Sequence, residues 1–154
     1  MKKFIPLLLS TVLVIGAAGC QNTAKTSANA PDNTNEAPKS PDTQTAQTNQ
    51  NDAQNQTRKA QLNSDIRAHE QRNNATGGGT NRNGNALASE VRDKLEANIP
   101  DSQLSVQANN GIVTVAGTVA NQQDLNKIVP EASKIKGVKN VVNKALVAPP
   151  KAKS

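Results

Sequence analysis

Residues 104–119 read LSVQANNGIVTVAGTV, and this stretch predicts the centre of the fold. Apolar and polar residues alternate on both sides of Asn109-Asn110-Gly111, which is typical of two strands that each bury one face. An Asn-Gly pair readily adopts the positive φ angles that a two-residue hairpin turn requires. We therefore expect a β-hairpin whose strands lie at 104–107 and 113–119.

A helix is expected before the hairpin. Leu87, Val91 and Leu95 recur every four residues, which predicts an amphipathic helix over 87–97 that ends at Ile99-Pro100. Its carboxylates are expected to face water; they belong to Glu90, Asp93 and Glu96.

A second helix is expected after the hairpin. Asn121 is suited to cap it, and Gly137 is suited to end it. Pro130 lies inside this segment and predicts a kink or two short helical pieces, because proline removes an intrahelical hydrogen bond. The apolar stripe of this helix is expected to comprise Leu125, Ile128, Val129, Ala132 and Ile135.

A valine-rich stretch from Val138 to Val147 predicts a final strand. The expected order is helix, strand, strand, helix, strand. We interpret 86–148 as a small α+β domain with one antiparallel or mixed sheet covered on one face by two helices, and 149–154 as a tail.

The composition excludes several classes of protein. With one cysteine and one histidine in 154 residues, the chain cannot supply a multi-ligand zinc site or an internal disulfide. Phe4 is the only aromatic residue, so no ring platform is available for stacking nucleic-acid bases. We expect no metal, no cofactor and no nucleic-acid partner.

The first 19 residues have the pattern of a signal peptide. Lys2 and Lys3 precede an apolar run that is shorter than the roughly 20 residues of a membrane-spanning helix. The alternatives are an ordinary secretory signal or an uncleaved helix. Ala17-Ala18-Gly19-Cys20 resembles the bacterial lipobox, and this resemblance implies cleavage before Cys20 and acylation of its thiol, with palmitate among the acyl chains. Several acyl chains give stable membrane anchoring.

Residues 20–85 are expected to form a lipid-anchored, low-complexity tether. Leu62 and Ile66 are the only large aliphatic residues between 21 and 85, too few to offset the entropy of folding. Such a disordered tether would place the domain on the order of 45 Å from the bilayer. A short helix is expected at 58–73, with Arg58, Leu62, Ile66 and His69 on one face, and we interpret it either as a frayed polar helix or as a docking or lipid-surface segment.

Two sequence blocks, 111–119 and 137–143, resemble the BON domain, named for bacterial osmotic-shock and nodulation proteins. They occur in the order and spacing of that family. The resemblance implies an α+β sandwich and a non-enzymatic role at membranes, commonly phospholipid binding in the periplasm. Three glycines are expected to be structural: Gly111 for positive φ, Gly117 for close packing of a helix or a bulge, and Gly137 as a helix stop.

No catalytic residues are expected, because the predicted domain contains neither histidine nor cysteine and its serines have no partner motif. Its basic side chains gather in the second helix and the last strand, near the expected membrane. Lysines near anionic lipid contribute about 1 kcal/mol each to binding, and a solvated helix face is the alternative interpretation. The candidate headgroup contacts are Lys127, Lys134, Lys136, Lys139 and Lys144.

Two functional hypotheses follow. In the first, a lipid-anchored envelope protein binds anionic phospholipid and supports envelope integrity or the stress response. In the second, the domain is an adaptor, tethered to the membrane, that recruits an envelope or cell-wall protein. Both place the chain in the cell envelope on the periplasmic side. Gln21 follows Cys20, and resemblance to a sorting system in which aspartate at this position retains lipoproteins at the inner membrane implies that the outer membrane is favoured.

Overall fold

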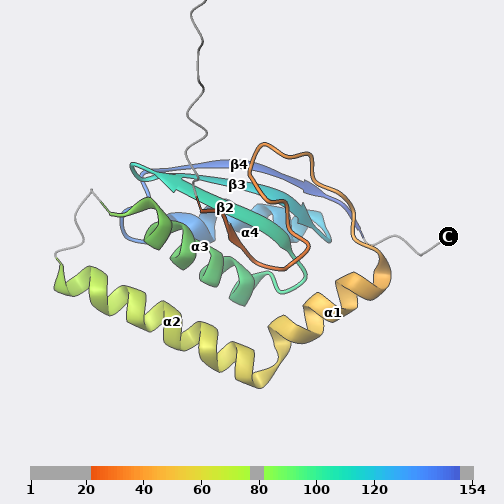
Figure 1. Cartoon of the computed structure of the whole chain (residues 1–154), viewed down its shortest axis with the longest axis horizontal. Coiled ribbons are helices and arrows are strands. Elements are labelled where there is room, and N and C mark those ends of the chain that lie inside the picture. The colour runs from red at the N-terminus through yellow and green to blue at the C-terminus, as the bar shows by residue number, and fades with distance from the viewer. Residues whose placement is uncertain (1–21, 77–81, 150–154) are drawn as a thin grey trace, which may run out of the picture.

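The computed structural model describes residues 22–76 and 82–149 (Figure 1). The predicted signal peptide at 1–19, Cys20 and most of the predicted tail lie outside the described residues. The elements follow in the order β1, α1, α2, α3, β2, β3, α4, β4. The last five of these elements form the predicted helix, strand, strand, helix, strand pattern.

The four strands form one mixed sheet in the order β1-β2-β3-β4. β2 (Gln103–Asn109) and β3 (Ile112–Val119) are the predicted antiparallel hairpin. Its two-residue turn has φ of 51° at Asn110 and 85° at Gly111, as the Asn-Gly pair predicts. β4 (Asn140–Val147) lies parallel to β3, whereas β1 (Ala24–Lys25), which was not predicted, pairs antiparallel with β2.

Two helices cover one face of this sheet, as predicted. α3 (Gly84–Asn98) packs on β2, and α4 (Gln122–Ser133) packs on β3 and β4. Both have apolar stripes at helical spacing that meet the alternating apolar positions of the strands. The buried core includes Leu87, Val91, Leu95, Ile99, Leu104, Val106, Val113, Val115, Val119, Ile128 and Ala132.

α4 differs from the prediction in three respects. Pro130 lies inside one continuous helix and does not divide it into the two short pieces that were predicted as the alternative to a kink; Pro130 and Asn126, whose carbonyl loses its donor, are both exposed to water. Val129 is 41% exposed and does not belong to the buried stripe. The helix ends at Ser133, and Gly137 follows in a turn with φ of 100°.

The segment before α3 is folded where a flexible tether was predicted. α1 (Thr43–Gln54) is capped by the side chain of Asp42, and α2 (Gln56–Ala75) by that of Asn55. α2 contains the predicted helix at 58–73 and packs along α3 as a third layer (Figure 1). The sequence prediction failed here because it counted only apolar contacts, and this packing depends mainly on charged groups.

Residues 23–36 also bind the sheet. Thr26 donates from its hydroxyl to the carbonyl of Ser102 and accepts from the Leu104 backbone N–H. Beyond this point, the chain crosses the face of the sheet opposite the helices, where Ser105 donates to the Pro31 carbonyl and Thr34 to the Gln107 side chain. This segment is therefore part of the folded domain.

Gly117 of β3 lies directly against the backbone of β2. Its φ is 127°, and a Cβ atom there would lie 2.0 Å from the carbonyl oxygen of Gln103. Gly117 was predicted to leave room for a helix or a bulge, and the structure instead places the backbone of the adjacent strand against it.

We predict that Gly117→Ala destabilises the folded chain by at least about 2 kcal/mol, because backbone strain and steric overlap add together. Urea unfolding of the chain from residue 21 onward measures this loss. Thr114→Ala in the same strand is the control and is expected to cost less than half as much. Equal stability of the two variants would contradict this account of Gly117.

Candidate functional site

Three carboxylates on α3 are buried against α2. The side chains of Glu90, Asp93 and Glu96 are at most 4% exposed, so the prediction that they face water is wrong. They lie three residues apart, on the face of α3 opposite the one that packs on the sheet. We call these three residues the acid row.

Glu96 forms the best-matched ion pair of the acid row. Arg58 of α2 donates from Nε to Oε1 at 2.6 Å and from Nη2 to Oε2 at 2.8 Å, and Arg92 donates to Oε2 at 3.2 Å. The hydrogen bond to Glu96 raises the pKa of Arg58 against the opposing effect of burial. Such a bidentate pair fixes the orientation of α2 on α3.

Glu90 at the other end of the acid row binds two donors. Arg82, which precedes α3, donates from Nη2 to Oε2 at 2.6 Å, and Asn73 of α2 donates from Nδ2 to the same oxygen at 3.0 Å. Arg82 also donates to the backbone carbonyl of Lys136 at 2.6 Å. This arginine therefore joins α3 to the turn after α4, a role that the sequence analysis did not assign.

Asp93 in the middle is poorly solvated. Arg92 Nη2 lies 2.8 Å from its Oδ1 without hydrogen-bond geometry, and His69 Nε2 lies 3.7 Å from its Oδ2. Burial is the main cause that raises the pKa of Asp93 to about 6. Burial, followed by the charge of Arg72, lowers the pKa of His69.

The predicted face of the 58–73 helix makes these contacts. Arg58 and His69 pair with the acid row, and Leu62 is 1% exposed. These contacts agree with the docking interpretation of this helix, and its docking surface is the chain's own α3. The sequence does contain a signal for this contact: the acids of α3 and the polar donors of α2 both recur at helical spacing. That signal becomes informative only when the two helices are known to lie side by side.

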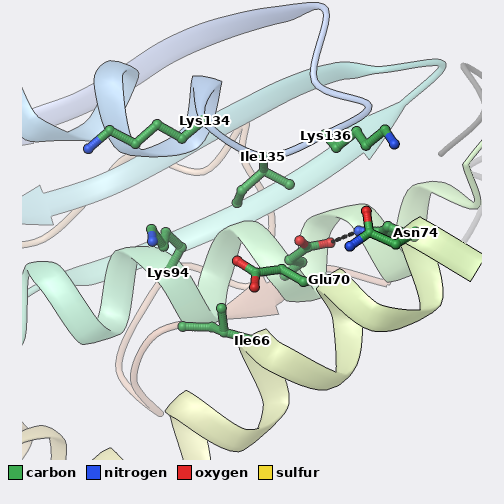
Figure 2. Close-up of a pocket in the computed structure, with 9 residues that line it drawn as sticks. Ile66, Glu70, Asn74, Lys94, Lys134, Ile135 and Lys136 are labelled. Carbon is green, nitrogen blue, oxygen red and sulfur yellow. Dashed lines mark hydrogen bonds between the residues drawn. The ribbon is translucent and has the colours of Figure 1, made fainter.

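A groove of about 290 Å³ lies between α2, α3 and the end of α4. Ile66 and Glu70 line it on α2, and Ile135 lines it after α4 (Figure 2). Figure 2 shows Lys134 and Lys136 pointing to opposite sides of Ile135. Lys134 and Lys136 therefore do not point toward a common position in the groove.

The five candidate lysines are distributed over several surfaces. Lys127 pairs with Asp124 at 2.8 Å, and Lys134 pairs with Glu131 at 2.6 Å. Lys144 lies on the opposite face of the sheet, where it donates to the side-chain oxygen of Asn35. Among the described residues, Lys136 and Lys139 have no acidic partner.

Lys136 and Lys139 lie at the end of the domain that carries the hairpin turn. The Lys139 backbone N–H donates to the Gly111 carbonyl at 2.8 Å, and its side chain lies against Gly111. Gly84 at the start of α3 lies against the Ala108 carbonyl, and Arg82 lies against Gly137. We call residues 82–85, 109–112 and 136–140 the hairpin end; these segments contain Arg82, Lys136 and Lys139 and no acidic residue.

The described residues contain no group of three or more metal-ligating side chains. Within the same ranges, no helix has the length and apolar character needed to cross a bilayer. The fold and these surfaces define a small α+β binding domain. Residues 83–149 match the family model described as the BON domain, and this part of the chain is a BON domain, a family associated with phospholipid binding and envelope stress. No curated protein matches the chain.

We predict that Arg58→Gln weakens the packing of α2 on α3, because Glu96 then keeps only Arg92 as a charged partner. The expected loss is roughly 1–3 kcal/mol, which is the usual cost of removing one partner of a buried hydrogen-bonded charge. Amide hydrogen exchange should accelerate in α2 more than in β2 and β3. Arg67→Gln makes the same charge change at an exposed position of α2 and is expected to have little effect; equal effects of the two substitutions would contradict this role of Arg58.

We predict that Asp93→Asn changes the pH dependence of stability. The folded-state pKa of about 6 lies above the ordinary value, so Asp93 stabilises the fold most when it is protonated below about pH 4, and this contribution is lost as the pH rises through 6. His69 acts in the opposite direction, because its lowered pKa gives a contribution that is lost as the pH falls.

His69 is present in both chains, so its effect largely cancels when the two are compared. Between pH 4 and 7, the Asp93→Asn variant should therefore gain on the order of 2 kcal/mol relative to the unsubstituted chain. Urea unfolding at several pH values measures this gain. Asp32→Asn, at a side chain that is 87% exposed, is the control. A difference between the Asp93 variant and the unsubstituted chain that does not vary with pH would contradict the assignment.

Proposed function

We propose that this chain is an envelope lipoprotein, anchored through acylated Cys20 and facing the periplasm, whose BON domain binds anionic phospholipid and supports envelope integrity under stress. The outer membrane is the favoured location where the cell has one. The observation that carries the proposal is the hairpin end of a domain from a family associated with phospholipid binding: Lys136 and Lys139 lack acidic partners there.

The proposal narrows the set of candidate headgroup contacts. Lys127, Lys134 and Lys144 already bind Asp124, Glu131 and Asn35, so a lipid phosphate would compete with these partners. Lys136 and Lys139 have no such competitor. Each lysine near an anionic surface contributes about 1 kcal/mol.

The adaptor hypothesis loses the observation that motivated it. It depended on a long flexible tether between membrane and domain, and within that segment β1 and α2 instead pack against the domain. Chemical crosslinking in intact envelopes, followed by identification of captured proteins, tests it directly. Abundant capture of one envelope protein by a surface other than the hairpin end would favour the adaptor.

We predict that the non-acylated chain from residue 21 onward, which retains every described residue, co-sediments with phosphatidylglycerol-containing vesicles and not with phosphatidylcholine vesicles. Binding should weaken with salt, because the attraction to a charged surface is screened. Lys136→Gln combined with Lys139→Gln should weaken it roughly tenfold or more, from about 1 kcal/mol per lysine.

The matched control neutralises two lysines that have partners. Lys127→Gln combined with Lys144→Gln makes the same change in net charge and is expected to reduce binding less than threefold if the hairpin end is the contact surface. Equal losses for the two double variants would show attraction by net charge alone. Equal binding to both kinds of vesicle would contradict the preference for anionic lipid.

A further inference from the structure

We propose that the hairpin end is the surface that faces the bilayer, and that β1 holds it there next to the acylated Cys20. This inference rests on the proposed lipid anchor. It goes beyond the proposed function because it assigns an orientation to the anchored domain and a distance between the domain and the bilayer. The domain lies close to the bilayer instead of at the end of the predicted flexible tether.

The direction of β1 shows where the described chain begins relative to the hairpin end. β1 is antiparallel to β2, with Ala24 opposite Val106 and Lys25 opposite Ser105. Thr23 continues toward the hairpin, since its hydroxyl accepts a hydrogen bond from Gln107 Nε2 at 2.9 Å. Followed toward its N-terminus, the described chain therefore leads to the hairpin end.

Covalent geometry limits the distance between Cys20 and the sheet. A residue spans at most about 3.6 Å, so the Cα atom of Cys20 lies within roughly 15 Å of Ala24, whatever the conformation between them. An acyl anchor on Cys20 thus reaches the sheet across four residues. The 65 residues that were expected to separate anchor and domain do not do so, because the chain joins the sheet at β1 and then returns through α1 and α2.

The side chains of the hairpin end suit contact with an anionic membrane surface. The hairpin end carries Lys136 and Lys139, which have no acidic partner among the described residues, and it exposes Ile112 to 47%, whereas the charge of Arg82 is already paired with Glu90. Cations together with an exposed aliphatic side chain match an anionic headgroup layer above hydrocarbon.

The opposite end of the domain carries two carboxylates, one of which is paired. Asp101 before β2 and Asp124 in the first turn of α4 lie close enough for Asp124 to contribute, after burial, to the raised pKa of Asp101. Lys127 pairs with Asp124 at this end. The chain direction and the position of the unpaired Lys136 and Lys139 therefore indicate the same orientation, with the hairpin end directed toward anionic lipid.

The experiment measures the depth of two labels in the acylated chain. Cys20 is the only cysteine, so acylation leaves an introduced cysteine as the single free thiol. Asn140→Cys places a fluorophore at the hairpin end, and Gln123→Cys places it at the opposite end; both positions are exposed. The eight residues of β3 separate these ends by roughly 25 Å.

The acylated protein is purified from membranes, its acylation is verified by mass spectrometry, and it is reconstituted in vesicles that contain phosphatidylglycerol and a headgroup-labelled quenching lipid. We expect quenching at position 140 to exceed that at position 123 about threefold or more, because of this separation. Equal quenching, stronger quenching at position 123, or an unacylated Cys20 would overturn the inference.

Failure of this inference can be told apart from failure of lipid recognition. If the non-acylated chain ignores vesicles while position 140 of the acylated chain is quenched, the orientation stands and recognition by the domain falls. If the non-acylated chain binds anionic vesicles but position 123 is quenched more strongly, lipid recognition stands and the orientation falls.

Discussion

The pairing of the acid row is the interaction on which the arrangement of the chain depends. Removing a carboxylate charge from water costs a large free energy, and hydrogen-bond donors offset that cost. Glu96 finds Arg58, and Glu90 finds Arg82 and Asn73. Two of these donors, Arg58 and Asn73, belong to α2, so the BON domain retains a helix that lies outside the matched region 83–149.

This pairing also gives a structural role to the low-complexity part of the chain. α2 contributes little apolar surface beyond Leu62 and Ile66, yet it forms a third layer over α3. β1 forms an edge of the sheet, and the segment after it crosses the face of the sheet opposite the helices. The N-terminal half therefore packs on two sides of the domain, and the direction of β1 along β2 brings the start of the described chain toward the hairpin end.

How far the sequence predicts the structure depends on the range of each interaction. The hairpin turn at Asn110-Gly111, the Asn121 cap and the core positions of α3 are determined by neighbouring residues, and all were predicted. The contact between Arg58 and Glu96 spans 38 residues and has no local pattern, so the acids were assigned to water. For the candidate site, composition indicated a basic surface, but only the fold separates Lys136 and Lys139 from the lysines that already have partners.

The brevity of β1 has a mechanical consequence. Only two residue pairs join it to β2, whereas seven pairs join β2 to β3. Tension applied at the N-terminal end of the chain therefore peels β1 from the sheet edge before it loads the central hairpin. Each residue released adds up to about 3.6 Å of slack, so the domain can yield to a pull through its first strand while its core stays intact.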